Sequence, residues 1–211
     1  MKLYGYFRSS AAYRARIALN YKGLTWEPRL VDLRPPASMQ HSPQFRAVNP
    51  QGLVPVPVDG DTILTQSLAI IEYLEELQPQ PPLVPKEALA RARVRSLSQL
   101  VASEIHPLNN LRVLQHLKRL GQTQEQIDTW YRHWIADGLA KLEAELEGTA
   151  GKFCHGNAPT MADCCLVPQI FNARRFNSDL APYPVTLRIF DACMKLDAFD
   201  RAQPSKQPDA E

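Results

Sequence analysis

The sequence has little excess charge of either sign and no long hydrophobic run, and each absence excludes a class of protein. The 24 Lys and Arg residues against 22 Asp and Glu residues give a formal net charge of +2. Nucleic-acid binders need a concentrated basic surface that displaces counterions, and a bilayer span needs roughly 20 apolar residues. We therefore expect no nucleic-acid or membrane partner. The N-terminal residues also lack the apolar core of a signal peptide, which favours the cytoplasm.

The four cysteines form no C-x-x-C pair. Cys154 and Cys193 stand apart, and Cys164 and Cys165 are adjacent in an apolar stretch of helical character. A structural zinc site needs a second ligand pair at suitable spacing, and Cys154-His155 has none. Disulfides are rare in a reducing compartment. We expect four buried thiols and no metal.

Of the 211 residues, 45% are hydrophobic, enough for a sizeable core. Over residues 1–77, strand and helix patterns alternate. Strands are expected at 2–7, 27–33, 56–58 and 62–64, and helices at 12–21, near Phe45 and at 67–77. This order, βαβ(α)ββα, is typical of a thioredoxin-like α/β domain.

A proline-rich segment follows, Gln78–Pro85, which cannot continue a helix. It marks a domain boundary: we expect an α/β domain over 1–78, a linker over 79–86 and an all-helical domain over 87–211. Helical periodicity recurs at 90–118, 124–147, 161–173 and 185–198, and residues 203–211 resemble a loose tail. In the third of these helices, Thr160 and Asp163 have capping-box spacing, which we assign to folding.

The connection from the first strand to the first helix is the functional point of a thioredoxin-like domain. Here it reads FRSSAA over residues 7–12 and contains no sulfur, so a dithiol oxidoreductase is excluded. Two interpretations remain. The serines are ordinary N-caps, or a thiol arrives with a bound molecule and the hydroxyl of Ser9 or Ser10 donates a hydrogen bond to its thiolate.

Two further pairs favour a bound peptide-like molecule. A cis bond at Val54-Pro55 would leave the Val54 main chain free to pair with such a ligand, whereas the simpler interpretation is an edge-strand proline. Gln66-Ser67 opens a helix whose unpaired N–H groups suit a carboxylate. Taken alone, that pair is only a cap.

Four segments over nearly the whole chain form a family pattern. They are 9–19 (SSAAYRARIAL), 66–76 (QSLAIIEYLEE), 161–169 (MADCCLVPQ) and 180–184 (LAPYP). In this order they resemble the glutathione transferase superfamily, most closely its zeta class, the maleylacetoacetate isomerases. That family reads SSCSxRVRIAL in the first segment. Ala11 replaces its cysteine, so any contribution of that cysteine is absent, whereas a thiol supplied by glutathione is unaffected.

The resemblance implies that glutathione is the cofactor and that the protein is a homodimer, and it implies roles by position. Ser9 would donate to the thiolate, with Ser10 beside it. The rest of the tripeptide would be held by Gln40, Val54, Pro55, Gln66 and Ser67. His106, Asn110 and Arg112 match the segment that approaches the thiol and the substrate pocket. His106 replaces a glutamine of animal members, and a structural role beside Pro107 stays open.

The implied reaction converts a maleyl keto acid, maleylacetoacetate, to its fumaryl isomer in aromatic amino acid catabolism. Thiolate addition makes the cis double bond single, rotation follows, and elimination returns the trans isomer. The dianionic substrate requires fixed cations, for which guanidinium groups are suited. Arg8 and Arg175 are favoured, with Arg14, Arg112 and Arg174 as further candidates.

Three alternatives stay open from the sequence. The substrate is maleylpyruvate instead, or the site conjugates or dehalogenates small α-halo acids, or the chain is a non-catalytic scaffold of the same fold. Retention of Ser9, Gln66 and Ser67 argues against the scaffold.

Overall fold

A four-stranded sheet in the order β2-β1-β3-β4 organises the N-terminal part of the chain. In the computed structural model, which describes residues 1–210, the strands are β1 (Lys2–Gly5), β2 (Glu27–Leu30), β3 (Val56–Asp59) and β4 (Thr62–Ile63). β1 pairs in parallel with β2 and antiparallel with β3, placing Gly5 opposite Leu30 and Tyr4 opposite Val56. β3 and β4 form the expected hairpin.

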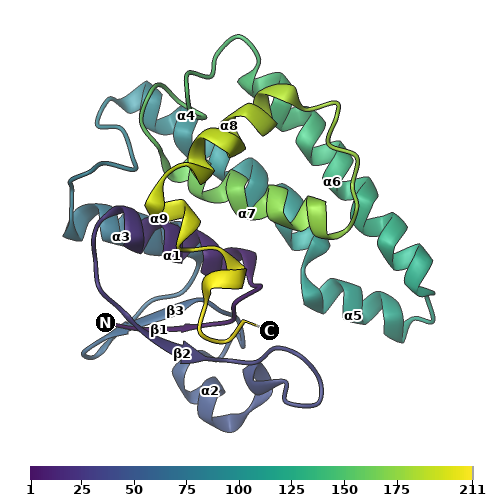
Figure 1. Cartoon of the computed structure of the whole chain (residues 1–211). Coiled ribbons are helices and arrows are strands. Elements are labelled where there is room, and N and C mark those ends of the chain that lie inside the picture. The colour runs from purple at the N-terminus through teal and green to yellow at the C-terminus, as the bar shows by residue number, and fades with distance from the viewer. Residues whose placement is uncertain (211) are drawn as a thin grey trace. The chain divides into compact units, whose positions relative to one another are not determined.

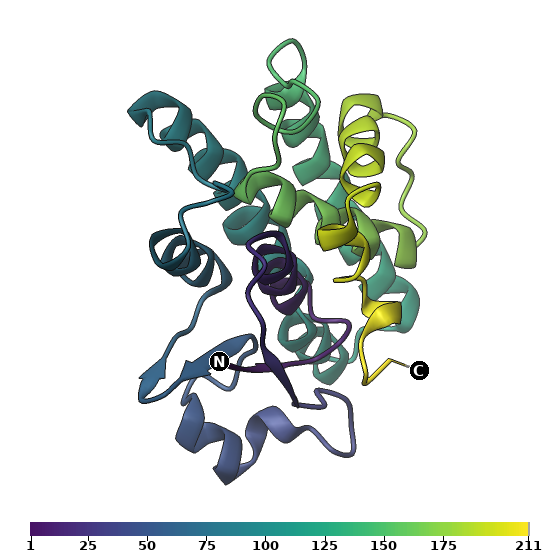
Figure 2. The same cartoon turned by 60° about the vertical axis from the view of Figure 1, so that its left-hand side comes forward.

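Helices cover both faces of this sheet. α1 (Ser10–Tyr21) and α3 (Ser67–Leu77) pack together on one face, and α2 (Pro43–Val48) lies on the other (Figures 1 and 2). Small, fully buried residues of α1 such as Ala15 and Ala18 allow the close approach of α1 and α3. On the α2 side, Phe45 packs with Val31 and Val56. The thioredoxin-like arrangement expected from the sequence is therefore present.

The chain divides into two compact units, but the C-terminal residues belong to the first. That unit comprises Met1–Leu83 and the described residues from Lys195 onward, and the second is Val84–Met194. The C-terminal residues form α9 (Asp197–Asp200), which contacts α1, and the 3-10 turn η4 (Pro204–Lys206) (Figure 1). We expected these residues in the helical domain and their end as a loose tail.

Two properties hold this C-terminal segment in the first unit. Its apolar residues Phe199 and Ala202 are fully buried. Its carbonyl groups accept hydrogen bonds from polar side chains of α1: Asn20 Nδ2 donates to Ala198 O at 3.1 Å, and Arg16 Nε donates to Ala202 O at 3.1 Å. Polar groups in a helix face that packs inward need such partners, a requirement that hydrophobic periodicity does not reveal.

The second unit is helical, as expected. Its α-helices are α4 (Ala88–Gln99), α5 (Leu111–Arg119), α6 (Gln124–Leu146), α7 (Met161–Arg175) and α8 (Pro184–Met194). The buried α7 packs against α4 and α8. The stretch of helical periodicity over 90–118 is interrupted by a widened π-helical turn, η2 (Leu100–Ile105), and a 3-10 turn, η3 (His106–Asn109). Pro107 lacks the backbone donor that a continuing helix requires.

The Thr160–Asp163 capping box is present at the start of α7. The fully buried Asp163 carboxylate accepts from the N–H of Thr160 at 2.7 Å, the hydroxyl of Thr160 at 2.8 Å and the N–H of Cys154 at 2.9 Å. Burial raises the pKa of this carboxyl. The pair therefore fixes the start of an inward-facing helix and the loop before it.

The cysteines and the helix lengths can be compared directly with the sequence-based expectations. All four cysteines are buried and free, which confirms the prediction of core thiols. Within residues 1–210, none of the helices is both long and apolar enough to cross a bilayer. In the same range, no group of three or more His, Cys, Asp or Glu side chains is placed to hold a metal ion.

Candidate functional site

The predicted glutathione-binding residues of the first unit gather at one end of the sheet because of its topology. β1 ends at Gly5, beside the start of β3, and leads directly into the segment with Ser9. β3 is preceded by Val54-Pro55 at the same end. β4 runs back antiparallel to β3, so the chain returns to this end where Gln66 and Ser67 begin α3. Segments distant in sequence thus meet at one edge.

Ser9 is the N-cap of α1, and this role leaves its hydroxyl proton available. Its Oγ accepts a hydrogen bond from the N–H of Ala12 at 3.2 Å. A hydroxyl that accepts with one lone pair can still donate its O–H, so the cap and the thiolate donor are compatible roles. The side chain of Ser9 is half-buried, whereas Ser10, the first residue of α1, is buried. Ser9 is therefore the more accessible of the two hydroxyls.

The Val54–Pro55 peptide bond is cis, as the sequence analysis considered. No other residue among 1–210 forms a hydrogen bond with the N–H or the C=O of Val54. Pro55 is buried, and Val54 is half-buried. The edge beside Val54 therefore offers one donor and one acceptor in an extended segment, which suits an added peptide strand.

The start of α3 combines a helix N-terminus with a nearby cation. Gln66 is exposed, has a φ of 67°, and donates from Nε2 to Gln51 Oε1 at 3.2 Å. Ser67 is buried, and its Oγ accepts from Arg14 Nη1 at 3.3 Å. Arg14 is 1% exposed, so its charge lies beneath the first turn of α3. The unpaired N–H groups of that turn and the guanidinium both favour an anion there.

The burial of Arg14 corrects one candidate of the sequence analysis. We considered this arginine among the residues that could meet a substrate carboxylate, yet it is enclosed and donates to Ser67. Its place in α1 gave no sign of this, because a charged residue on a helix is usually solvated. Gln40 is also buried, in η1 (Met39–His41), and its Nε2 donates to Leu33 O at 3.3 Å.

Arg8 lies directly before Ser9 and rests on aromatic rings. Its guanidinium carbon is 4.8 Å from the centre of the Phe7 ring, and its Nη2 donates to the hydroxyl of Tyr6 at 3.0 Å. Arg34, which the sequence analysis did not select, approaches the same two rings. It also bonds Asp32 through two nitrogens at 2.9 Å, which lowers the pKa of that carboxyl to about 2. Arg34 forms a salt bridge with Asp32, so of these two guanidinium groups Arg8 is the better placed to meet a ligand.

In the second unit, Asn110 and Arg112 lie at the start of α5. Asn110 is the N-cap, and its Oδ1 accepts from the Arg112 N–H at 3.1 Å, which leaves its side-chain amide group to donate. The Arg112 side chain is exposed. His106 begins η3 and is half-buried. The structure therefore places these three predicted residues on consecutive turns of one segment.

Arg174 and Arg175 end α7 but have different surroundings. Arg174 lies over the Phe190 ring at 4.2 Å, and Arg175 lies over the Phe176 ring at 4.8 Å. Phe176 itself stacks on Tyr131, with ring centres 3.6 Å apart. Burial raises the pKa of Tyr131 to about 12, although the charge and hydrogen bond of Arg175 oppose the shift. Arg175 is therefore held by a neutral aromatic pair and not by a carboxylate.

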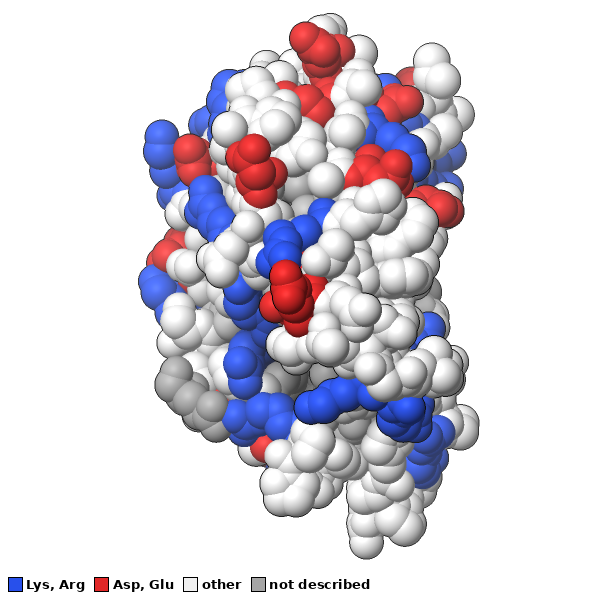
Figure 3. All heavy atoms as spheres, turned by 90° about the vertical axis from the view of Figure 1, so that its right-hand side faces the viewer, with Lys and Arg blue, Asp and Glu red and all other residues white. Residues whose placement is uncertain are grey.

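Charged side chains of both signs lie on the surface. On the face drawn in Figure 3, acidic and basic side chains are interspersed in the upper part, whereas the charged side chains in the lower part are mostly basic.

Comparisons with known proteins agree over the whole chain. Residues 3–82 match the family profile of the glutathione S-transferase N-terminal domain, and residues 124–201 match that of the C-terminal domain. The probable maleylacetoacetate isomerase of Vibrio cholerae is 49% identical over 209 residues, which are 99% of this chain and 97% of that protein.

Solved structures are equally similar. The holo structure of a maleyl pyruvate isomerase, described as a bacterial zeta-class glutathione S-transferase, matches at 45% identity over 100% of both chains, with a TM-score of 0.96. The maleylacetoacetate isomerase of Methylobacterium extorquens AM1, with bound malonate and GSH, matches at 46% identity over 100% of both chains, again with a TM-score of 0.96. The chain belongs to the glutathione transferase family, in the zeta class that includes the maleylacetoacetate isomerases.

Proposed function

We propose that this protein is a glutathione-dependent isomerase that converts the cis double bond of a maleyl keto acid, maleylacetoacetate, to the trans bond of the fumaryl isomer. The observation that carries the proposal is the meeting, at one end of the sheet, of a half-buried serine hydroxyl, an unpaired main-chain segment and a helix N-terminus. These groups match the thiol, the peptide and the carboxylate of glutathione in turn.

The residues of the first unit hold the tripeptide by ordinary polar recognition. Val54 pairs its N–H and C=O with the peptide backbone. Gln66 and Ser67 bind the carboxylate of the γ-glutamyl end at the start of α3, where the buried Arg14 adds a positive charge. Gln40 and Pro55 shape the edge on which the ligand lies.

Ser9 controls the protonation of the thiol. When bound, glutathione supplies a thiolate that adds reversibly to the conjugated double bond, which becomes single, rotates and re-forms as trans when the thiolate leaves. The Ser9 O–H donates a hydrogen bond to the sulfur and stabilises its anionic form, while Ala12 N–H holds the serine oxygen in place. Ser10 supports this turn of α1.

Guanidinium groups hold the substrate and stabilise charge that develops during the reaction. A maleyl keto acid carries two separated carboxylates and, after addition, negative charge on a carbonyl oxygen. Arg8 lies over Phe7 and donates to Tyr6, and Arg175 lies over Phe176; within residues 1–210 neither forms a salt bridge with a carboxylate. Both guanidinium groups can therefore bind an anion. His106, Asn110 and Arg112 are the further candidates for substrate binding in this proposal.

Maleylpyruvate is a second candidate substrate, because the relative with 45% identity and full coverage of both chains is a maleyl pyruvate isomerase. The two keto acids present the same maleyl group and differ beyond it. The protein is further proposed to act as a homodimer in the cytoplasm, where glutathione is kept reduced.

One experiment tests the proposal against its alternatives. Each maleyl keto acid is followed by absorbance with and without glutathione, and glutathione binding is measured by calorimetry. We expect binding, and turnover only when glutathione is present. Binding without isomerisation of either keto acid would favour conjugation of α-halo acids or a scaffold, and the absence of binding would exclude all glutathione-dependent functions.

A further inference from the structure

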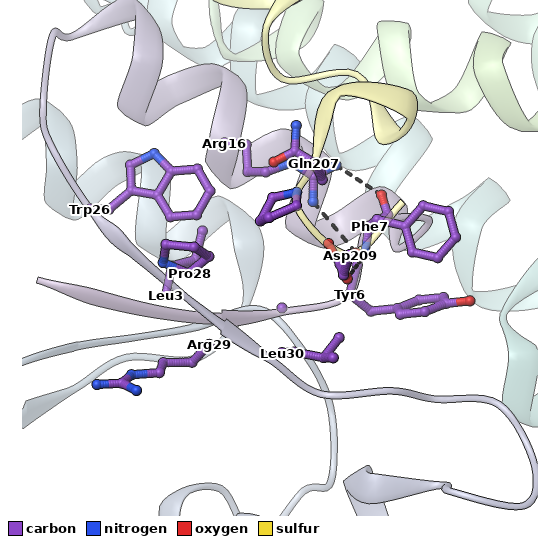
Figure 4. Close-up of a pocket in the computed structure, with 12 residues that line it drawn as sticks. Leu3, Tyr6, Phe7, Arg16, Trp26, Pro28, Arg29, Leu30, Gln207 and Asp209 are labelled. Carbon is purple, nitrogen blue, oxygen red and sulfur yellow. Dashed lines mark hydrogen bonds between the residues drawn. The ribbon is translucent and has the colours of Figure 1, made fainter. Parts of the chain in front are cut away.

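Two side chains hold the main chain of Phe7, in the loop between β1 and α1: that of Asp209 in the C-terminal segment and that of Arg16 in α1. The Phe7 N–H donates to Asp209 Oδ2 at 2.9 Å, and the Phe7 C=O accepts from Arg16 Nη2 at 2.9 Å (Figure 4). All these residues belong to the first unit. The main-chain N–H and C=O of Phe7, two positions before Ser9, are thereby both fixed.

Arg16 connects the same loop to a second point of the C-terminal segment. It is 3% exposed, and besides Phe7 it donates to the carbonyl oxygens of Tyr6 at 3.5 Å and Ala202 at 3.1 Å. Burial lowers its pKa to about 10, while the nearby Asp209 carboxylate acts in the opposite direction. The guanidinium therefore stays charged at neutral pH, and Asp209 is the acid that balances it.

The loop itself is a tight turn that transmits a displacement of Phe7 to Ser9. The Ser9 N–H donates to Tyr6 O at 3.0 Å, so Phe7 and Arg8 are the two corner residues between them. Holding the Phe7 N–H fixes one corner of the turn. The direction of the Ser9 hydroxyl and the position of the Arg8 side chain both depend on the backbone conformation at Phe7.

Close packing does not explain the position of Asp209. A cavity of about 300 Å³ separates the segment 207–209 from much of the sheet, and its lining includes Leu3, Trp26 and Leu30 (Figure 4). Gln207 Nε2 donates to Arg201 O at 3.0 Å and to Gln203 O at 2.9 Å, which ties the segment to the turn before it. From there the segment reaches the loop, where Asp209 accepts from the Phe7 N–H.

We propose that Asp209 is a positioning residue for the isomerase site: by accepting from the Phe7 N–H, it sets the turn that aims Ser9 and Arg8. The proposal rests on the function proposed above. It predicts that a residue near the C-terminus, which touches neither substrate nor glutathione, controls the chemical step.

The test compares Asp209→Ala, Asp209→Asn and Lys206→Ala in the full-length protein. The asparagine keeps an oxygen that accepts from Phe7, so it should restore most of what alanine loses. Lys206→Ala is the matched control, because it removes a tail ion pair with Asp200 and leaves the Phe7 bond intact. The readouts are steady-state kinetics, the pH at which bound glutathione forms its thiolate, followed by ultraviolet absorbance, and amide hydrogen exchange at residues 7–9.

For Asp209→Ala we expect kcat to fall about ten- to a hundredfold, since small misplacements of catalytic groups have effects of that order. The KM for glutathione should change little because Val54, Gln66 and Ser67 are untouched. The pH of thiolate formation should rise, and exchange at residues 7–9 should become faster. The control should match the wild type in kcat, in the KM for glutathione, in the pH of thiolate formation and in exchange.

Two results overturn the proposal. Either the alanine variant keeps wild-type kcat and exchange, or exchange becomes faster while kcat and the thiolate pH stay the same, which would show a purely structural tie. Failure of the proposed function is a different result, namely a wild-type protein that does not bind glutathione or isomerise, and the exchange measurement still tests the tie in that protein.

Discussion

At the residue scale, one substitution at Ser9 tests both its observed role as an N-cap and its proposed role as a donor to the thiolate. Ser9→Ala removes the N-cap of α1 and the proposed donor to the thiolate. We expect turnover to fall roughly 10²-fold or more, as for other donors to a developing anion, and stability to fall by about 0.5–2 kcal/mol. Kinetics and thermal unfolding measure the two effects.

A second N-cap supplies the control for that prediction. Ser42 caps α2, accepting from the Phe45 N–H at 3.2 Å, and is not among the proposed site residues. Ser42→Ala should therefore cause a similar loss of stability with unchanged turnover. If Ser9→Ala also left turnover unchanged, the donor role would pass to Ser10.

Arg175 and Arg174 are neighbours, but we expect only Arg175 to contribute to substrate binding. Arg175→Ala, like Arg8→Ala, should lower kcat/KM by about one to two orders of magnitude, because one charge-assisted hydrogen bond contributes about 1.5–3 kcal/mol. Glutathione binding should be retained. Lysine at either position should rescue only in part, because it lacks the planar fork of donors.

Arg174→Ala is the matched comparison, because Arg174 stacks on Phe190 at the same helix end. It should keep kcat/KM near the wild-type value. If the Arg8 and Arg175 variants both retained full kcat/KM instead, the substrate carboxylates would be bound elsewhere, and Arg112 and Arg174 would be tested next.

At the scale of elements, the start of α7 shows how a motif can belong to folding alone. Thr160→Ala removes the hydroxyl that donates to Asp163 and should lower stability by about 0.5–2 kcal/mol. Turnover per folded molecule should stay unchanged. Denaturant unfolding and kinetics on the folded fraction separate the two, and a selective loss of activity at wild-type stability would place this segment in the site.

Sequence patterns predicted most elements because their signals are local. The β1–α1–β2 unit, the β3–β4 hairpin and the Ser67 helix start each follow from periodicity and turn residues. The π-helical turn over 100–105 was not predicted, since it involves a tertiary contact: Gly138 of α6 leaves space that the Ile105 side chain occupies, and a Cβ there would lie 2.3 Å from Ile105 Cγ1. Periodicity within one helix carries no information on such a contact.

The same reasoning explains which parts of the candidate site were predictable. Ser9, Val54-Pro55 and Gln66-Ser67 stand at element boundaries, where residue type and spacing are informative. The buried Arg14 and Arg16 and the tie to Asp209 connect positions up to 202 residues apart in sequence. No pattern of one helix or one loop indicates these connections.

At the scale of the whole molecule, we expect a symmetric homodimer, the commonest assembly of soluble oligomers. Light scattering at micromolar concentration should give twice the mass of one chain. A monomer mass under those conditions would contradict the expectation, and the proposed glutathione site would then have to function in a single chain.

The central claim is that glutathione bound at the Ser9 edge is required for isomerisation and is not consumed. The most direct measurement follows maleylacetoacetate by absorbance at a fixed enzyme concentration, with glutathione omitted, added below the substrate concentration, and added in excess. We predict no turnover without glutathione and complete conversion to the fumaryl isomer with the substoichiometric amount, with all the glutathione recovered as free thiol. Conversion that stopped when the glutathione was exhausted, or that proceeded equally well without it, would contradict the account.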